Sequence, residues 1–197
     1  MDPGCHVSAQ PPRLQPVSYL FLCSLGFWCW IAHFLKREFE TLFVHKFSRP
    51  TMPLMNLFKN SMYYWAFAAI VGLVLCSPDY TPTANPLQVQ IGLAIFVLCE
   101  LLNGVVHLQL AMMRPKEGSD KREPPSGGLF GLCSCPNYFF EVMSWVGFSI
   151  MTSIPFAWAF TAVGFLQMWQ WANGKHRGYV KQDPKLKRRA AIVPFLL

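Results

Sequence analysis

Four polar residues interrupt a long apolar stretch, and their spacing places them on one face of a helix. Glu100, Asn103, His107 and Arg114 lie within or directly after the stretch 88–113. At ~100° per residue, His107 and Arg114 fall within about 40° of Asn103, and Glu100 within about 60° of it. Polar side chains are costly in lipid and need a partner or a function. The face predicts either an interhelical hydrogen-bonding seam or a polar cavity, with Arg114 at a cytosolic mouth where it can grip phosphate.

A second polar cluster closes the first apolar stretch of the chain. His33, Lys36, Arg37 and Glu40 follow one another there at helical spacing. Lys36 and Glu40 stand at i, i+4, which favours an ion pair at the end of a helix. Lysines at such ends commonly extend toward the membrane surface, so the cluster alone does not separate a structural from a catalytic role.

A third polar cluster opens a later apolar stretch. Asn137, Tyr138 and Glu141 follow Pro136, a residue that favours the first position of a helix. Asn137 and Glu141 are four residues apart and therefore share one face. A tyrosine at this position is typical of an interfacial anchor, but its two polar neighbours favour a pocket.

The elements that position these clusters are long apolar helices. Apolar stretches cover 18–35, 61–77, 88–113 and 138–172, and the last has Pro155 at its middle. As one helix, that last stretch would exceed about 50 Å at the ~1.5 Å rise per residue, whereas the bilayer core is about 30 Å thick. We therefore divide it at Pro155, which predicts an all-α polytopic membrane bundle with about five transmembrane helices.

The basic residues orient these helices in a membrane. All but one of the 17 Lys and Arg residues lie in 36–60, 114–137 and 173–197, and the exception is Arg13. These segments alternate with nearly uncharged turns, which predicts a lumenal start and a cytosolic tail by the positive-inside rule. The net charge of +7 accompanies apolar helices rather than an RNA-reading module. It therefore favours anionic headgroups and an anionic cytosolic ligand, not nucleic acid.

The remaining sequence features concern the leader and the cysteines. Residues 1–17 are polar and Pro-rich, which predicts a disordered leader before a membrane domain at 18–197. Cys133 and Cys135 form a C-x-C pair without the spacing of a zinc site or a neighbouring His pair, so we predict no metal site.

Three stretches of the sequence resemble a known family. HFLKREFETLFVHKFSRPTMPLMNLFKN (33–60), SCPNYFFEVMSWVGF (134–148) and GKHRGYV with IVPFLL (in 174–197) closely resemble the very-long-chain trans-2-enoyl-CoA reductases, relatives of the steroid 5α-reductases. The resemblance extends over residues ~30–197. It implies a multi-pass enzyme of the endoplasmic reticulum membrane with a cytosolic C-terminus. Such an enzyme reduces the 2,3 double bond of a very-long-chain trans-2-enoyl-CoA with NADPH, beside the elongase and dehydratase of fatty acid elongation and among membrane lipids.

The resemblance also implies roles for individual residues. It assigns catalysis to Lys36, before ETLF, and to Tyr138, at the end of SCPNY. Hydride attack at the β-carbon creates an enolate that a hydrogen-bond donor stabilises, and Tyr138 can supply the proton. We expect Lys36 to assist the phenol if the two helices bring them together. The implied cofactor-binding residues are Asn103, His107, Arg114, Asn137, His176, Arg177 and Tyr179.

Two functional hypotheses remain open at this point. Members of the family carry an N-terminal ubiquitin-like domain and at least one earlier membrane segment, for which this sequence offers no match. The first hypothesis is an active enoyl-CoA reductase, and the second is a truncated, non-catalytic membrane partner of the elongation machinery. The steroid branch has a tyrosine at the position of Phe34 and a phenylalanine at that of Tyr138, so both positions favour the enoyl-CoA branch.

Overall fold

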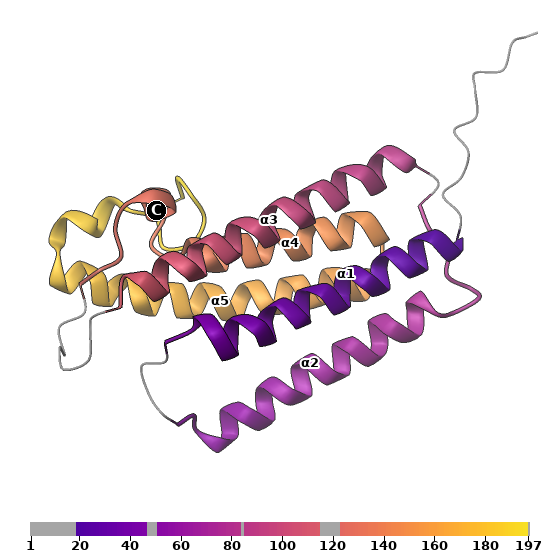
Figure 1. Cartoon of the computed structure of the whole chain (residues 1–197), viewed down its shortest axis with the longest axis horizontal. Coiled ribbons are helices and arrows are strands. Elements are labelled where there is room, and N and C mark those ends of the chain that lie inside the picture. Colours follow the sequence, from indigo (N-terminus) through magenta and orange to yellow (C-terminus); the bar gives the residue numbers. More distant parts are fainter. Residues whose placement is uncertain (1–18, 47–50, 84, 115–122, 197) are drawn as a thin grey trace, which may run out of the picture.

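The computed structural model describes residues 19–46, 51–83, 85–114 and 123–196. In these ranges every regular element is helical, and five long helices lie side by side as a bundle (Figure 1), which confirms the predicted fold class. The predicted leader 1–17 lies outside the described residues. The elements are α1 (Tyr19–Phe39), the π-helical turn η1 (Glu40–Val44), α2 (Leu54–Leu75), α3 (Pro86–Met112), the 3-10 turn η2 (Gly128–Gly131), α4 (Pro136–Thr152), α5 (Pro155–Gln182) and the 3-10 turn η3 (Pro184–Arg188).

Three of the long helices, α3, α4 and α5, begin with a proline. Pro155 is the first residue of α5, and the division of the last apolar stretch there is confirmed. Only Ser153 and Ile154 separate α4 from α5, and Ser153 adopts a left-handed conformation with φ 57° that ends α4. Pro86 starts α3 in the same way, after the Asn85 side chain accepts a hydrogen bond from the backbone N–H of Leu87 at 3.0 Å.

The fifth helix is longer than its apolar part. The end of the apolar stretch at residue 172 predicts that His176, Arg177 and Tyr179 lie just past this helix. That prediction is wrong, because α5 continues to Gln182. Nothing in the intervening sequence breaks a helix before Pro184, and the polar residues keep helical backbone once the apolar part has started the helix. The polar end of α5 therefore carries these side chains on a rigid element.

Helices α3 and α4 touch backbone to backbone. A Cβ atom added to Gly147 would lie 2.6 Å from the Phe96 nitrogen and 2.7 Å from the Gly92 oxygen. Gly92 makes the reciprocal approach, since a Cβ there would lie 2.7 Å from the Gly147 oxygen. Small residues at such a crossing let two membrane helices pack closely. This crossing fixes the polar face of α3 against the start of α4.

Aromatic side chains fill the centre of the bundle. The ring of Trp145 on α4 lies 4.9 Å from Trp30 on α1 and 4.7 Å from Phe160 on α5, measured between centroids. Phe148 is fully buried beside them. Edge-on pairs at these distances stabilise beyond the area they bury. The cluster packs α1, α4 and α5 against one another.

The outside of the bundle is apolar. Large hydrophobic side chains remain exposed along α1, α2, α3 and α5, for example Trp28, Trp65, Leu101 and Leu166. Such a surface is unfavourable in water and suits lipid. By length and composition alone, α3 is the one helix of the described segments that is long and apolar enough to cross a membrane.

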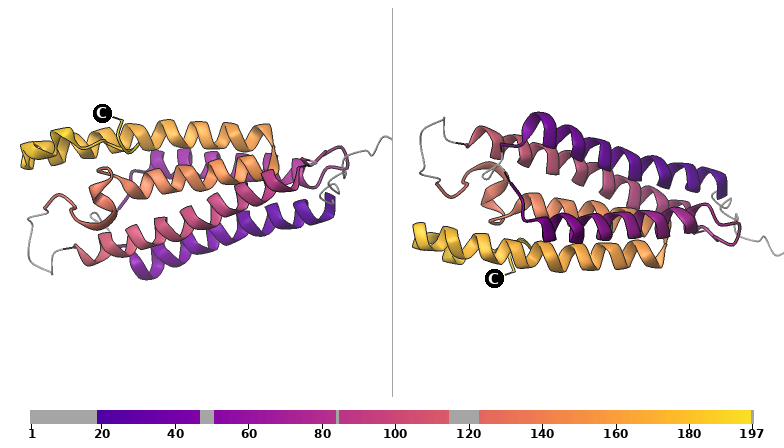
Figure 2. Two further views of the ribbon diagram at one scale, coloured as in Figure 1. Left: turned by 90° about the horizontal axis from the view of Figure 1, so that it is seen from above. Right: turned by 90° about the horizontal axis from the view of Figure 1, so that it is seen from below.

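The C-terminal segment folds back onto the start of α4 (Figure 2). The backbone N–H of Ser134 donates to the Ala190 carbonyl at 2.8 Å, and that of Cys135 donates to the Ala191 carbonyl at 3.0 Å. Ile192 is buried next to this pairing. The segment thereby holds the residues that precede Tyr138.

Candidate active site

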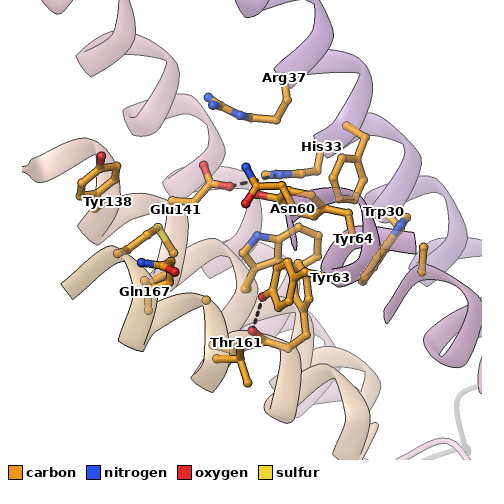
Figure 3. A pocket seen from close by; sticks show the side chains of 18 of the residues that line it. Trp30, His33, Arg37, Asn60, Tyr63, Tyr64, Tyr138, Glu141, Thr161 and Gln167 are labelled. Carbon is orange, nitrogen blue, oxygen red and sulfur yellow. Dashed lines mark hydrogen bonds and ion pairs between the residues drawn. The ribbon is translucent and has the colours of Figure 1, made fainter. Parts of the chain in front are cut away.

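A cavity of about 680 Å³ opens between α1, α2, α4 and α5 (Figure 3). Its polar side carries His33 and Arg37 of α1 with Tyr138 and Glu141 of α4. Its deeper wall is aromatic, and among its residues are Trp30, Tyr63, Tyr64, Trp145 and Phe160. A cavity with one polar side and one apolar wall suits a ligand that has a polar head and a hydrocarbon tail.

His33 lies between two carboxylates. Its Nδ1 atom is 2.7 Å from Glu100 Oε1, and its Nε2 atom is 3.2 Å from Glu141 Oε1. An imidazole donates through both nitrogens only as the imidazolium. In that form three bases of α1 face three carboxylates from η1, α3 and α4, and the cluster is electrically balanced. The cluster comprises His33, Lys36, Arg37, Glu40, Glu100 and Glu141.

Lys36 is fully engaged in this cluster. Its Nζ atom donates to Asn103 Oδ1 at 2.6 Å and lies 3.0 Å from Glu100 Oε2 and 3.3 Å from Glu40 Oε1. The approach to Glu100 Oε2 is an ion pair without hydrogen-bond geometry, and that buried oxygen makes no hydrogen bond within the described part of the chain. The predicted ion pair between Lys36 and Glu40 is confirmed.

Asn103 connects three elements through one amide. Besides accepting from Lys36, it donates through Nδ2 to the Asn137 carbonyl at 2.9 Å and to Glu141 Oε2 at 3.2 Å. Both Nδ2 hydrogens are used and only 1% of Asn103 is exposed, so the amide is not accessible to a ligand. The polar face of α3 thus forms the predicted interhelical seam at this residue, and the residue acts by positioning its neighbours.

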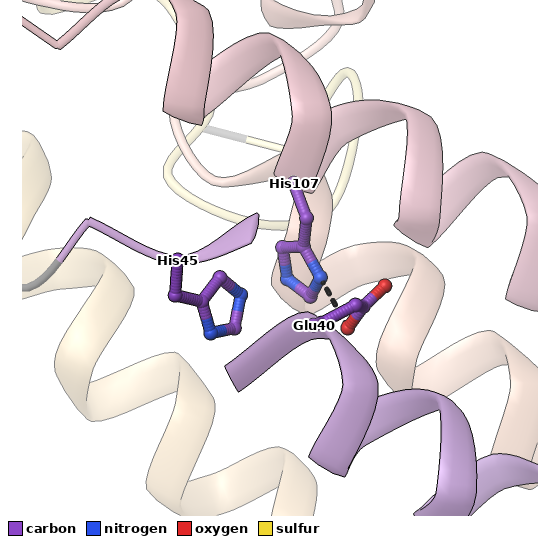
Figure 4. A group of neighbouring side chains, drawn as sticks. All are labelled: Glu40, His45 and His107. Atoms are coloured by element: carbon purple, nitrogen blue, oxygen red, sulfur yellow. Dashed lines mark hydrogen bonds and ion pairs between the residues drawn. The ribbon is translucent and has the colours of Figure 1, made fainter. Parts of the chain in front are cut away.

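His107 joins a second group at the end of α1 (Figure 4). Its Nδ1 atom lies 2.8 Å from Glu40 Oε2, and its ring is 4.8 Å from that of His45. Burial would raise the pKa of Glu40, but the hydrogen bond from His107 and the charges of Lys36 and Arg37 lower it to about 2. Burial, His107 and Arg37 lower the pKa of His45 to about 4. Both residues lie beyond the apolar part of α1.

Glu40, His45 and His107 are close enough to share a metal ion. One ligand atom from each lies within 4.8 Å of the others. However, Arg37 Nη1 stands 2.7 Å from Glu40 Oε2 and 3.0 Å from His107 Nδ1. The Arg37 guanidinium thus already neutralises the Glu40 carboxylate. We therefore assign these residues an electrostatic role and not the binding of a metal ion.

Tyr138 has a cationic neighbour, but that neighbour is not Lys36. The Lys175 Nζ atom of α5 lies 4.6 Å from the centroid of the Tyr138 ring, and the Trp171 ring lies 6.2 Å from it. Lys36 directs its contacts to Glu40, Glu100 and Asn103 instead. Lys175 was not predicted from the sequence, because a basic residue after an apolar stretch is typical of a lipid-facing anchor.

The other predicted cofactor residues fall into two groups. His107 and Asn137 line the cavity beside Tyr138. Arg114 follows α3, and His176, Arg177 and Tyr179 lie on the polar end of α5, outside the residues that line the cavity. His176 Nδ1 lies 2.8 Å from Ser134 Oγ, and Arg177 Nε donates to the Asn173 carbonyl at 3.3 Å. Of these predicted cofactor-binding residues, only His107 and Asn137 therefore line the same cavity as Tyr138.

Comparison with known proteins places the chain in a family. Residues 50–197 match the family described as 3-oxo-5-alpha-steroid 4-dehydrogenase. The chain belongs to this family. It is 46% identical over 172 residues to the very-long-chain enoyl-CoA reductase of Dictyostelium discoideum, with 86% of this chain and 56% of that protein aligned.

Two further relatives carry similar names. A Trypanosoma brucei brucei protein named as an enoyl-CoA reductase is 52% identical over 166 residues, with 84% of this chain and 56% of that protein aligned. A trans-2,3-enoyl-CoA reductase-like protein of Mus musculus is 36% identical over 181 residues, covering 88% of this chain and 50% of the mouse protein. The chain thus spans about half the length of these relatives. It is an all-α, membrane-associated member of the family and resembles its enoyl-CoA reductase branch.

Proposed function

We propose that this protein reduces the 2,3 double bond of a very-long-chain trans-2-enoyl-CoA with NADPH. The observation that carries the proposal is the pairing of the Tyr138 phenol with the Lys175 ammonium at the rim of a cavity with an aromatic wall. The pair offers a proton donor with a cation beside it, and the wall offers a surface for an acyl chain. The names of the relatives support the same reaction.

Polar groups at the rim fit a dinucleotide phosphate cofactor. The side-chain amide of Asn137 makes no hydrogen bond to any residue that the structure describes, although its carbonyl accepts from Asn103. Arg177 uses Nε for a backbone carbonyl and keeps its terminal nitrogens for an anion, to which a guanidinium binds through two parallel hydrogen bonds. Asn137, His107, Arg114, His176, Arg177 and Tyr179 would hold NADPH, which supplies the hydride when bound.

The chemistry of the chain's own residues follows from the geometry at Tyr138. As the β-carbon accepts a hydride, negative charge develops on the thioester oxygen and the α-carbon must gain a proton. The Tyr138 hydroxyl would give up its proton to the α-carbon, and the O–H electron pair would remain on the phenol oxygen. Lys175 stabilises that phenolate from its position by the ring. Later uptake of a proton from water restores the phenol.

Lys36 enters this proposal as a positioning residue. It is the donor to Asn103 Oδ1, and Asn103 in turn binds the Asn137 carbonyl and Glu141. The chain of contacts therefore fixes the first turn of α4, where Tyr138 lies. Its loss would shift the phenol relative to the substrate, and a small displacement of a reacting group lowers the rate strongly.

The proposal includes a cellular setting. The distribution of basic residues supports a cytosolic C-terminus, and the activity would place the protein in the endoplasmic reticulum membrane. There it would take its substrate from a dehydratase, which forms the enoyl-CoA, and return a saturated acyl-CoA to an elongase. The lipid-facing surface of the bundle fits the surroundings of such a multi-pass protein.

The test is oxidation of NADPH by the purified protein in detergent, with and without a long-chain trans-2-enoyl-CoA. We expect substrate-dependent oxidation, loss of that oxidation in Tyr138→Phe, and unchanged NADPH binding in the variant. Full activity in Tyr138→Phe would refute the assigned proton donor. A folded wild-type protein that binds NADPH without turnover would favour the alternative, a non-catalytic membrane partner of the elongation machinery.

A further inference from the structure

A second cavity lies on the outer side of α4 and α5, next to the C-terminal segment. It has a volume of about 370 Å³ and an almost wholly apolar wall. Phe139 and Val146 of α4, Trp158 and Phe165 of α5, and Ile192 contribute to this wall. We call this cavity the outer groove. Among the residues that line it, Thr161 and Trp158 carry a polar side-chain atom, a hydroxyl and an indole N–H respectively.

Two side chains belong to the walls of both cavities. Val142 of α4 and Thr161 of α5 line the candidate active site and also the outer groove. The Thr161 hydroxyl donates to the Ala157 carbonyl of α5 at 2.8 Å and lies 3.1 Å from the Ser149 hydroxyl of α4, so it already has hydrogen-bonding partners on both helices. The side chains of Val142 and Thr161 therefore form a thin partition between the two cavities. Consecutive residues face opposite sides of it, since Tyr138 lines the active-site cavity and Phe139 the outer groove.

The dimensions of the outer groove suit a hydrocarbon chain. From Phe139 to Val146 the rise of an α-helix gives a length of about 10 Å. Its volume of about 370 Å³ is more than twice that of an engineered apolar cavity of about 150 Å³ that binds benzene, which leaves room for about a dozen carbon atoms. No charged side chain lines it that could bind a nucleotide or a CoA phosphate.

We propose that the outer groove binds the distal part of the substrate's acyl tail, which passes between α4 and α5 beside Val142 and Thr161. This inference rests on the proposed function and adds a determinant of chain length to it. Each methylene removed from water favours binding by about fourfold, so a groove of this size discriminates strongly between long and short tails. Substrates whose tails are too short to cross the partition gain no binding affinity from the outer groove.

The decisive variant fills the groove from an exposed position. Ala162 of α5 is exposed and lines the groove, so Ala162→Phe occupies the space without entering the core of the bundle. Ala159→Phe is the matched control, because Ala159 is exposed on the same helix and lines neither cavity. We compare kcat/KM for trans-2-enoyl-CoA substrates of about eight and about twenty-two carbons, a difference that spans the capacity of the groove.

We expect Ala162→Phe to lower kcat/KM for the long substrate by about 15-fold or more, the effect of losing two methylene contacts, and to leave the short substrate within about twofold. Ala159→Phe leaves both substrates unchanged. Equal losses on both substrates, or no loss on the long one, would overturn the inference while the short-chain activity upholds the proposed function. Absence of turnover with either substrate would count against the proposed function instead.

A photocrosslinking experiment tests whether the outer groove binds the acyl tail, and it does not depend on turnover. A long-chain acyl-CoA with a photoreactive diazirine near the end of its tail is irradiated with the protein in phosphatidylcholine nanodiscs. We expect crosslinks on the α5 segment around Trp158 and Phe165 that unlabelled acyl-CoA prevents and that Ala162→Phe abolishes. Crosslinks that excess acyl-CoA leaves in place would show that the probe's tail reaches the groove without specific binding, and the inference would then be wrong.

Discussion

Replacement of Lys175 by methionine tests whether the cation beside Tyr138 takes part in catalysis. Methionine keeps the length and the apolar stem of the side chain and removes its charge. The Lys175 Nζ atom lies 4.6 Å from the centre of the phenol ring. At that distance a full negative charge would be stabilised by about 0.9 kcal/mol in water and by about 3.6 kcal/mol at an effective dielectric constant of about 20.

The exposure of Lys175 decides between these limits. Since the side chain is exposed, the lower part of the range applies, and a cation–π contact at such a site adds about 0.5–1 kcal/mol. We take about 1–2 kcal/mol in total, which lowers kcat about 5- to 30-fold. The KM for the enoyl-CoA stays the same, because the charge on Tyr138 develops only in the transition state.

The assay is steady-state NADPH oxidation by wild type, Lys175→Met, Lys175→Arg and Lys181→Met. Lys181 is an exposed lysine on the same helix without a contact to Tyr138 in the described structure, so it controls for loss of positive charge. We expect Lys175→Arg to keep most of kcat and Lys181→Met to keep all of it. The reasoning is refuted if Lys175→Met stays within about twofold of wild type in kcat, or if Lys181→Met falls as far.

Three further predictions concern stability and reactivity. Gly147→Ala forces α3 and α4 apart at a 2.6 Å contact and should lower stability by about 1–3 kcal/mol in thermal melts, whereas Gly131→Ala, with open space around it, should not. In the folded protein the pKa of His45 is lowered to about 4, so on acidification the unfolded chain takes up a proton at His45 before the folded chain does. Stability therefore falls as the pH drops from about 6.5 to 4, and His45→Gln should flatten that part of a curve of Tm against pH. Burial raises the pKa of the Cys133 thiol to about 11, so a maleimide at pH 8 should modify exposed Cys76 well before it, and equal rates measured by mass spectrometry would contradict the described packing.

The polar face of α3 was predictable because its cause is local. Helical periodicity and the cost of exposing polar groups to lipid together require Glu100, Asn103 and His107 to face protein, and all three are buried. The division at Pro155 follows from similar local reasoning about helix length. Predictions of this kind need only the sequence around each residue.

The partner of Tyr138 was not predictable, because it depends on how whole helices lie against each other. The resemblance to the family assigns catalysis to both Lys36 and Tyr138, but the orientation of α1 directs Lys36 toward Glu100 and Asn103. Lys175 reaches the phenol because α5 stays helical beyond its apolar part and runs alongside α4. The close crossing at Gly147, which no single-residue property marks, sets the position of α4 in this arrangement.

The backbone pairing before α4 has a consequence for the order of events during synthesis. The N–H groups of Ser134 and Cys135 bind carbonyls of Ala190 and Ala191, which the ribosome adds about 56 residues later. At about 5–20 residues per second, the start of α4 waits about 3–11 s for these partners. During that interval the two donors lack their native partners, so the segment before Tyr138 reaches its final conformation late. The candidate active site is therefore completed only after the C-terminal segment has been synthesised.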